Sequence, residues 1–319
     1  MGPDLACVAG EPDPPDPPDT GSELTLSLAS RIATLLSRRI AALDERTPAE
    51  LSFANLWLFR IVHRWRFHDG PWPHIAGIGY DGQHHALPLF DVRLAPVAVL
   101  RALVARHGSL SPLSEPEAAA MDGRHFTLTA NRDDSDYLYR ASDFRHYQGS
   151  GLHNKRNLMA ALLATHPVQA RAYQAGHRED ALTVLAGWML DKGLQAGEAD
   201  EIPCREALGR AGQLGLRGFL YEVDGRAAGF LLAEALQPGL WVIRFAKARM
   251  RYKGLAQFMF HHFAADDEHA VIWLNFEQDL GLPNFRQTKM SYRPAALIPK
   301  WRLLPRQEPS VPPRPGIPP

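Results

Sequence analysis

Hydrophobic and polar positions follow helical periods through much of the first hundred residues. From Leu24 to Leu43 apolar residues recur every three or four positions, which predicts an amphipathic helix packed on a core. A membrane-surface helix is the weaker alternative for this segment. Thr47-Pro48-Ala49-Glu50 has the pattern of a capping box, so a second helix is expected over Leu51–Trp65. A third is expected from Pro96 to Arg106.

Strand-like patterns lie between and after these helices. His74–Tyr80 and Gln83–Phe90 flank Asp81-Gly82, a dipeptide typical of hairpin turns. Shorter strands are predicted at Phe126–Ala130 and Tyr137–Arg140. The first half of the chain therefore mixes helices with antiparallel strands.

The second half begins with helices and continues with a sheet. Residues 151–190 are predicted to be helical with one interruption at Pro167, and a further helix follows Pro203. Strands are then expected over Gly218–Val223, Ala227–Leu236, Trp241–Ala246 and Val271–Leu274, with a helix over Gln257–Ala265 before the last.

Composition indicates a globular chain with an acidic leader. The 319 residues are 45% hydrophobic and carry 35 basic and 35 acidic side chains. Residues 1–22 hold five acids and no base, and residues 305–319 hold two bases and one acid. The remaining 33 basic and 29 acidic residues leave a charge of +4, which is too small for sequence-specific DNA binding.

The two ends of the chain are predicted to be disordered, because residues 1–22 and 305–319 are rich in proline and poor in apolar residues. The leader lacks the pattern of a secretory signal, and no apolar run is long enough to span a membrane. The only cysteines, Cys7 and Cys204, are not spaced for a disulfide framework or a metal site. We therefore expect a cytoplasmic protein without a bound metal.

The second half resembles the acyltransferase core of the GNAT superfamily, with three strands, an Arg-x-x-Gly-x-Ala loop, a helix and a strand. In that loop, Arg251, Lys253 and Gly254 would let a pyrophosphate approach unpaired N–H groups at a helix start. An acyl-CoA-dependent N-acyltransferase is therefore one alternative function. Equally open is that Gly254 only permits close packing.

A more specific resemblance follows in the run from Leu274 to Pro294, which reads LNFEQDLGLPNFRQTKMSYRP. This run resembles the signature of the phosphatidylglycerol lysyltransferase C-terminal domain family. Tyr137-Leu138-Tyr139-Arg140, His153-Asn154-Lys155-Arg156-Asn157 and Trp188 agree with it, so the likeness covers about residues 45–304.

The resemblance implies an α/β fold made of two tandem GNAT-like halves. Residues 23–150 would form a degenerate half, and residues 151–304 the half with the active site. It also implies transfer of an amino acid from aminoacyl-tRNA to a hydroxyl or amine acceptor, with no separate cofactor. The acceptor would be a phosphatidylglycerol-type lipid, reached at the inner membrane face, or a small metabolite. A non-catalytic lipid- or RNA-binding relative is a further alternative. Arg249-Met250-Arg251 stands where many members carry an acid, so a role for that acid is not expected here.

Four residues of the signature are candidates for catalysis. Glu277 and Asp279 could deprotonate the acceptor, and being two apart they would point the same way if the strand continues. Alternatively, Glu277 pairs with Arg286 or Lys289 and only fixes a loop. Lys289 could hold a phosphate or an oxyanion, and Tyr292 could protonate the leaving 3′ oxygen.

The substrate-binding candidates are mostly basic and aromatic. A cationic cluster at a helix start suits a tRNA acceptor stem or a lipid phosphate, and the tyrosines could stack on a terminal adenine. A solvated helix face and ordinary strand packing are the alternatives. These candidates are Tyr137, Tyr139, Arg140, His153, Lys155, Arg156, Asn157, Arg251, Lys253, Gly254, Asn275 and Arg286.

Overall fold

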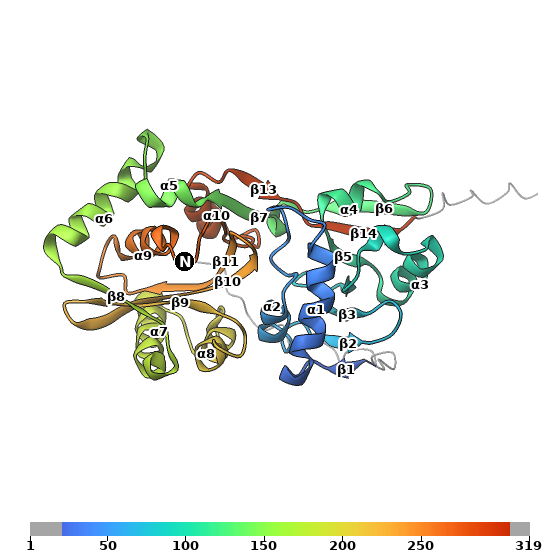
Figure 1. Ribbon diagram of the computed structural model, residues 1–319, viewed down its shortest axis with the longest axis horizontal. Helices are drawn as coiled ribbons and strands as arrows, with labels where there is room; N and C mark the ends of the chain where they lie inside the picture. Colours follow the sequence, from blue (N-terminus) through green and yellow to red (C-terminus); the bar gives the residue numbers. More distant parts are fainter. Residues whose placement is uncertain (1–20, 307–319) are drawn as a thin grey trace, which may run out of the picture.

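Two seven-stranded mixed sheets form the two lobes of the molecule (Figure 1). The structure is a computed structural model that describes residues 21–306. Most of the two segments predicted to be disordered, and Cys7, lie outside these residues. Ser22 and Pro305 contradict this prediction, because Ser22 begins β1 and Pro305 ends β14.

The first sheet has the strand order β1-β2-β3-β4-β5-β14-β6 and is antiparallel except where β4 meets β5. Its strands are β1 Ser22–Glu23, β2 Arg66–His68, β3 His74–Ile78, β4 His84–Pro88, β5 Leu110–Leu113, β6 Phe126–Ala130 and β14 Trp301–Pro305.

The second sheet has the order β13-β7-β12-β11-β10-β9-β8, and only β11 and β12 run parallel. Its strands are β7 Asp136–Arg140, β8 Val168–Ala172, β9 Arg217–Val223, β10 Arg226–Gln237, β11 Leu240–Ala248, β12 Trp273–Asn275 and β13 Ala296–Ile298.

Helices cover both faces of the second sheet, with α7 and α8 on one side and α9 on the other (Figure 1). The α-helices are α1 Ala29–Ile40, α2 Phe53–Leu58, α3 Val97–His107, α4 Glu115–Ala119, α5 Ala141–His146, α6 His153–Thr165, α7 Arg178–Lys192, α8 Glu201–Arg210, α9 Leu255–Ala265 and α10 Pro283–Met290. Among residues 21–306, no helix is both long and apolar enough to cross a bilayer.

The two lobes share structure across residue 150, where a boundary between halves was predicted. Strand β7 precedes this residue but lies in the second sheet, and β14 follows it but lies in the first, between β5 and β6. One hydrophobic core also joins Ile32 and Leu56 of the first lobe to Leu185 and Phe230 of the second. The lobes are therefore interlocked.

The predicted helix over Leu51–Trp65 is much shorter in the structure. Ser52, and not Thr47, caps α2, because its side chain accepts from the N–H of Asn55 at 3.0 Å. The capping-box Glu50 instead forms an ion pair with Lys300. Glu50, which the local pattern assigned to a helix cap, is thus engaged in a tertiary contact.

The prediction for residues 151–190 missed a strand. After Pro167 the chain forms β8, which pairs antiparallel with β9, before it resumes as α7. Sheet pairing with a distant strand overrides the helical pattern here. The helix predicted after Pro203 begins slightly earlier, at Glu201, with the proline in its first turn. The other predicted helices and strands are present, with small shifts at their ends.

Candidate active site

The signature run forms the end of β12, a tight loop and α10. Asn275 closes the loop: its side-chain oxygen accepts from the N–H of Glu277 at 2.7 Å, and its Nδ2 donates to Asp136 at 3.1 Å. Glu277 adopts φ 55°, in the left-handed region, so the strand does not continue beyond Asn275. The loop is thereby fixed at the carboxyl end of a strand in the middle of the second sheet.

Glu277 is bound by a buried arginine that the sequence analysis missed. Arg244 Nη1 donates to Glu277 Oε1 at 2.5 Å, and its Nε and Nη2 bind Glu234. Leu232 pairs with Phe245 and Ala233 with Ile243, which makes Arg244 the extra residue of a β-bulge. The bulge aims the guanidinium at Glu277. An arginine within the apolar run Trp241–Ala246 was the available sequence signal.

Glu277 keeps part of its carboxylate open. Its side chain is 22% exposed, and its second oxygen has no hydrogen-bond partner among residues 21–306. The alternative in which Glu277 pairs with Arg286 or Lys289 is wrong, because Arg244 is its ion-pair partner.

Lys289 acts on the backbone of the same loop. Its ammonium donates to the carbonyl oxygens of Phe276, Glu277 and Gln278 at 2.7, 3.2 and 2.5 Å. Burial lowers the pKa of Lys289 to about 8. All three N–H groups of the ammonium are used, which favours a role in shaping the loop that presents Glu277.

Asp279 lies in a different environment from Glu277. Its side chain is fully buried and accepts from Arg286 at 2.9 and 3.0 Å, from Arg132 at 3.2 Å and from the Tyr137 hydroxyl. Burial alone would raise the pKa of this carboxyl, but the hydrogen bonds from Arg286 and Tyr137 hold it well below its usual range. The expectation that both carboxylates point the same way is wrong, because the strand ends at Asn275.

The two tyrosines of β7 lie in the core. Tyr137 and Tyr139 are fully buried and stacked, with their ring centroids 6.5 Å apart. The Tyr139 hydroxyl donates to the Lys289 carbonyl at 2.8 Å. Arg140 is exposed, and its guanidinium lies 5.6 Å from the Trp273 ring. This arrangement matches ordinary strand packing, and no face for stacking on a base is left open at either tyrosine.

Tyr292 is also buried, in an aromatic cluster. It is 3% exposed, stacks on Phe144 at 5.3 Å, and its hydroxyl accepts from Gln257 at 3.0 Å. Lys289 and Tyr292 therefore do not share an open face, although they are three residues apart. Burial raises the pKa of the Tyr292 hydroxyl, which makes it a poorer proton donor.

The cationic cluster at the start of α6 is divided by its contacts. Arg156 and Asn157 hydrogen-bond to the two ring nitrogens of His153 at 2.9 and 2.8 Å. Lys155 turns away from them, because its ammonium donates to Ser291 Oγ at 2.8 Å and lies 4.0 Å from the Tyr292 ring. The structure thus brings Lys155 to the segment after α10.

The Arg-x-x-Gly-x-Ala loop is explained by helix packing. Gly254 has φ 97°, and a Cβ placed there would lie 2.1 Å from the carbonyl oxygen of Leu158 in α6. Arg251 and Lys253 are exposed beside it. The close approach of α6 accounts for the glycine without a phosphate, so this loop does not favour the acyl-CoA alternative.

The charge of Glu277 acts on one residue of the first lobe. Tyr80 lies in the turn between β3 and β4, and its ring packs edge-on to His63 at 4.5 Å. Burial, and after it the charges of Glu277 and Glu50, raise the pKa of the Tyr80 hydroxyl. The turn is therefore close enough to interact electrostatically with Glu277, about two hundred residues later in the sequence, which no local pattern signals.

Further buried ion pairs surround this region. Lys300 pairs with Asp136 at 2.6 Å and with Glu50. Lys247 pairs with Asp200 at 2.6 Å and lies 4.0 Å from the Trp188 ring. In the part of the chain that the structure describes, no group of three or more His, Cys, Asp or Glu side chains is placed to hold a metal ion.

The second sheet is covered by helices, has a bulge in β11 and carries the Glu277 loop at the end of β12. Together with the first mixed sheet it forms a tandem GNAT-like α/β fold. The chain belongs to the family described as phosphatidylglycerol lysyltransferase, C-terminal, which residues 41–304 match. The predicted family and fold class are therefore confirmed.

Solved structures share the fold at low sequence identity. A conserved protein of unknown function from Bacteroides thetaiotaomicron is 22% identical, with a TM-score of 0.75 over 90% of this chain and 99% of that chain. L-PGS from Bacillus licheniformis is 10% identical, with a TM-score of 0.60 over 92% and 95%. FemX is 6% identical, with a TM-score of 0.57 over 89% and 96%. A search of curated proteins finds no significant match.

Proposed function

We propose that this protein is an aminoacyltransferase that moves an amino acid from aminoacyl-tRNA to a hydroxyl or amine acceptor. Membership in the transferase family supports the reaction class. The observation that carries the proposal is the loop from Asn275 to Asp279, in which Glu277 is hydrogen-bonded to Arg244 through one carboxylate oxygen and has the other open. The acceptor is a phosphate-bearing lipid at the membrane surface or a small metabolite.

The reaction needs little chemical activation. The acceptor oxygen or nitrogen attacks the carbonyl carbon of the aminoacyl ester, and the bond from that carbon to the tRNA 3′ oxygen breaks. The proton of the acceptor passes to Glu277 and then to the 3′ oxygen. Because the ester is already reactive, the protein mainly positions the two substrates, which suits one fixed carboxylate.

Arg244 orients this carboxylate in the proposed mechanism. Its guanidinium is shared between Glu234 and Glu277, so it holds the Glu277 side chain in one position. Tyr80, whose pKa the charge of Glu277 helps to raise, would border the bound acceptor. Asp279 and Lys289 would support the loop, and neither would exchange a proton with the substrate.

A transfer assay with the full chain tests the proposal. The protein is incubated with radiolabelled aminoacyl-tRNAs and a lipid or metabolite extract, and label that leaves the tRNA for an acceptor is measured. We expect transfer that RNase treatment of the tRNA abolishes. Glu277→Gln should lower the rate by about 10²- to 10⁴-fold, as expected when a general base is lost.

Glu222→Gln is the matched control, because Glu222 also pairs with an arginine, Arg171 at 3.0 Å, but on the β8–β9 edge. Its transfer rate should equal that of the unchanged protein. If no amino acid is transferred from any tRNA, the proposal fails. Micromolar binding of acetyl-CoA in calorimetry would then favour the N-acyltransferase alternative.

A further inference from the structure

A cavity between α6 and α10 is lined by two basic side chains, Lys155 and Arg293, and by no acidic side chain. Its volume is about 560 Å³, and it is lined by Gly151, Asn154 and Lys155 near the start of α6 and by Ser291, Arg293 and Pro294 after α10. Other buried cations are paired with carboxylates, as in Arg39–Glu117 and Lys300–Asp136, whereas Lys289 is held by backbone carbonyls. Lys155 and Arg293 form no such pair with any carboxylate that the structure describes.

Lys155 is held at the base of this cavity. Its ammonium donates to Ser291 Oγ at 2.8 Å and lies over the Tyr292 ring, and Ser291 in turn donates to the Thr288 carbonyl at 2.6 Å. Burial lowers the pKa of Lys155, and no neighbouring charge offsets this effect. Lys155 is half-buried, and an anion bound beside it would offset the cost of partly desolvating a cation that has no carboxylate partner.

Arg293 is held at the exposed rim. It has φ 58°, a left-handed position just after a helix end where glycine is usual. Its side chain lies on Gly151, since a Cβ at Gly151 would be 2.9 Å from Arg293 Nε. The missing side chain at Gly151 thus leaves room for the guanidinium to lie over the start of α6.

We infer that Lys155 and Arg293 bind the phosphate group of the acceptor substrate. This inference rests on the proposed function, because it assigns the anion to the acceptor. Arg293 supplies a planar pair of donors and Lys155 a point charge, a combination suited to phosphate. Met290, which is 44% exposed, and Pro294 add an apolar wall. The ligand is therefore a phosphate ester with an apolar part, from either a soluble metabolite or a lipid headgroup.

Binding measurements on the full chain test the inference without any transfer reaction. Glycerol 3-phosphate in calorimetry represents the soluble source, and co-sedimentation with phosphatidylglycerol vesicles, compared with phosphatidylcholine vesicles, represents the lipid source. Lys155→Met and Arg293→Gly should each weaken binding of at least one phosphate probe by 10-fold or more. The probe that is weakened identifies the source.

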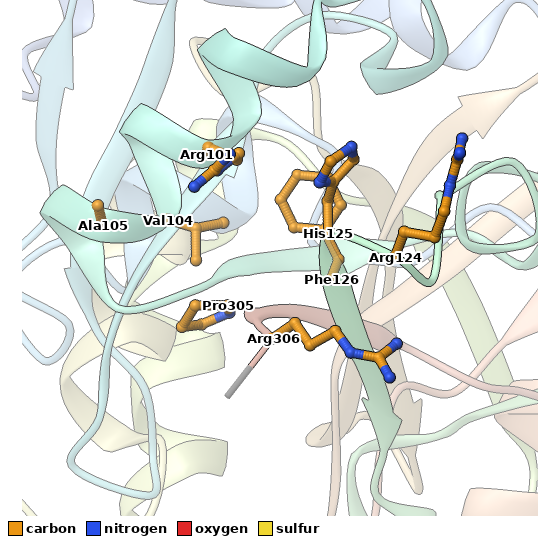
Figure 2. A pocket seen from close by; sticks show the side chains of 8 residues that line it. All are labelled: Arg101, Val104, Ala105, Arg124, His125, Phe126, Pro305 and Arg306. Carbon is orange, nitrogen blue, oxygen red and sulfur yellow. The ribbon is translucent and has the colours of Figure 1, made fainter. Parts of the chain in front are cut away.

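These variants are expected to remain folded, so that a loss of binding would not be caused by unfolding. Lys155→Met keeps the alkyl chain on Tyr292, and Arg293→Gly suits the left-handed backbone, so melting temperatures should stay near the unchanged value. Arg101→Gln is the control. Arg101 lines a separate cavity of about 380 Å³ in the first lobe (Figure 2). Arg124, which lines the same cavity, is already paired with Asp122 at 2.7 Å. This control should bind both probes like the unchanged protein.

Three outcomes would overturn the inference: no binding of either probe at millimolar concentration, equal binding by the variants and the unchanged protein, or weakening of tRNA binding alone. Its failure is distinguishable from failure of the proposed function. If the two variants lose phosphate binding but the unchanged protein transfers no amino acid, the phosphate site is supported and the proposed transferase function is rejected. If the unchanged protein transfers an amino acid and the variants still bind phosphate normally, the transferase function is supported and the phosphate site is rejected.

Discussion

Glu277 and Asp279 are two residues apart, and their surroundings differ. Asp279 is a buried acceptor for Arg286, Arg132 and Tyr137, whereas Glu277 pairs with Arg244 and keeps one oxygen open. A carboxylate that holds three partners contributes mainly to folding. A carboxylate with a free oxygen on a fixed loop is available to a substrate.

We therefore expect two conservative substitutions to differ in their effects on stability and on transfer. Asp279→Asn should lower the free energy of unfolding by about 3 kcal/mol at pH 7, because it breaks a buried charge network. Glu277→Gln should lower it by about 1 kcal/mol, since Arg244 keeps Glu234, yet nearly abolish transfer. Urea unfolding and the transfer assay measure the two quantities.

The effect of Asp279 should also depend on pH. Its folded-state pKa is depressed, so its stabilisation is complete above the unfolded value of about 3.9 and is lost as the pH falls further. The stability gap between Asp279→Asn and the unchanged protein should therefore narrow below about pH 4. A gap that stays constant down to pH 2.5 would contradict the assigned network.

At the scale of elements, the packing of α9 on α6 depends on one glycine. The backbone of Gly254 has φ 97° and approaches the Leu158 carbonyl so closely that no side chain fits. Gly254→Ala should lower the free energy of unfolding by about 3 kcal/mol, from steric overlap and from left-handed strain. Urea unfolding checks this value.

Gly197→Ala separates the two causes. Gly197 has φ 85°, but an added Cβ would meet nothing within 4 Å. The strain alone should therefore cost only about 1 kcal/mol. Equal losses in the two variants would mean that the contact with Leu158 contributes nothing.

At the scale of the whole molecule, the two lobes depend on each other. Strand β7 completes the second sheet from the first half of the sequence, and β14 lies between β5 and β6 from the end of the second half. A shared core joins α1 and α2 to α7 and α8. Each half taken alone would lack a central strand of one sheet and expose part of this core.

We expect that fragments 1–150 and 151–319, expressed separately, do not unfold cooperatively. Mixing them should restore a cooperative transition if they associate, because each supplies the missing strand of the other. Thermal unfolding followed by circular dichroism measures this. A cooperative transition in either fragment alone would show that the predicted halves fold independently.

Local patterns predicted the elements whose stability is local. The hairpin at Asp81-Gly82, the strands predicted over Gly218–Val223 and Ala227–Leu236, and the amphipathic helix observed as α1 depend on turn chemistry and periodicity within a few residues. The prediction missed strand β8, because β8 is stabilised by pairing with β9, far along the chain. It also placed the cap of α2 wrongly, because Glu50 forms an ion pair with the distant Lys300. Local propensity cannot register such contacts.

The sequence alone determined the family, the α/β class and the residues around the signature loop, since motif spacing and periodicity are properties of the chain itself. Only the tertiary structure decided which signature residues are open. It buried Asp279 and Tyr292, turned Lys289 to backbone carbonyls, and brought Arg244 to Glu277 through a bulge. It also placed Arg293 beside Lys155. These outcomes depend on contacts between residues far apart in the chain, whose energies exceed local preferences and appear only when both lobes are folded.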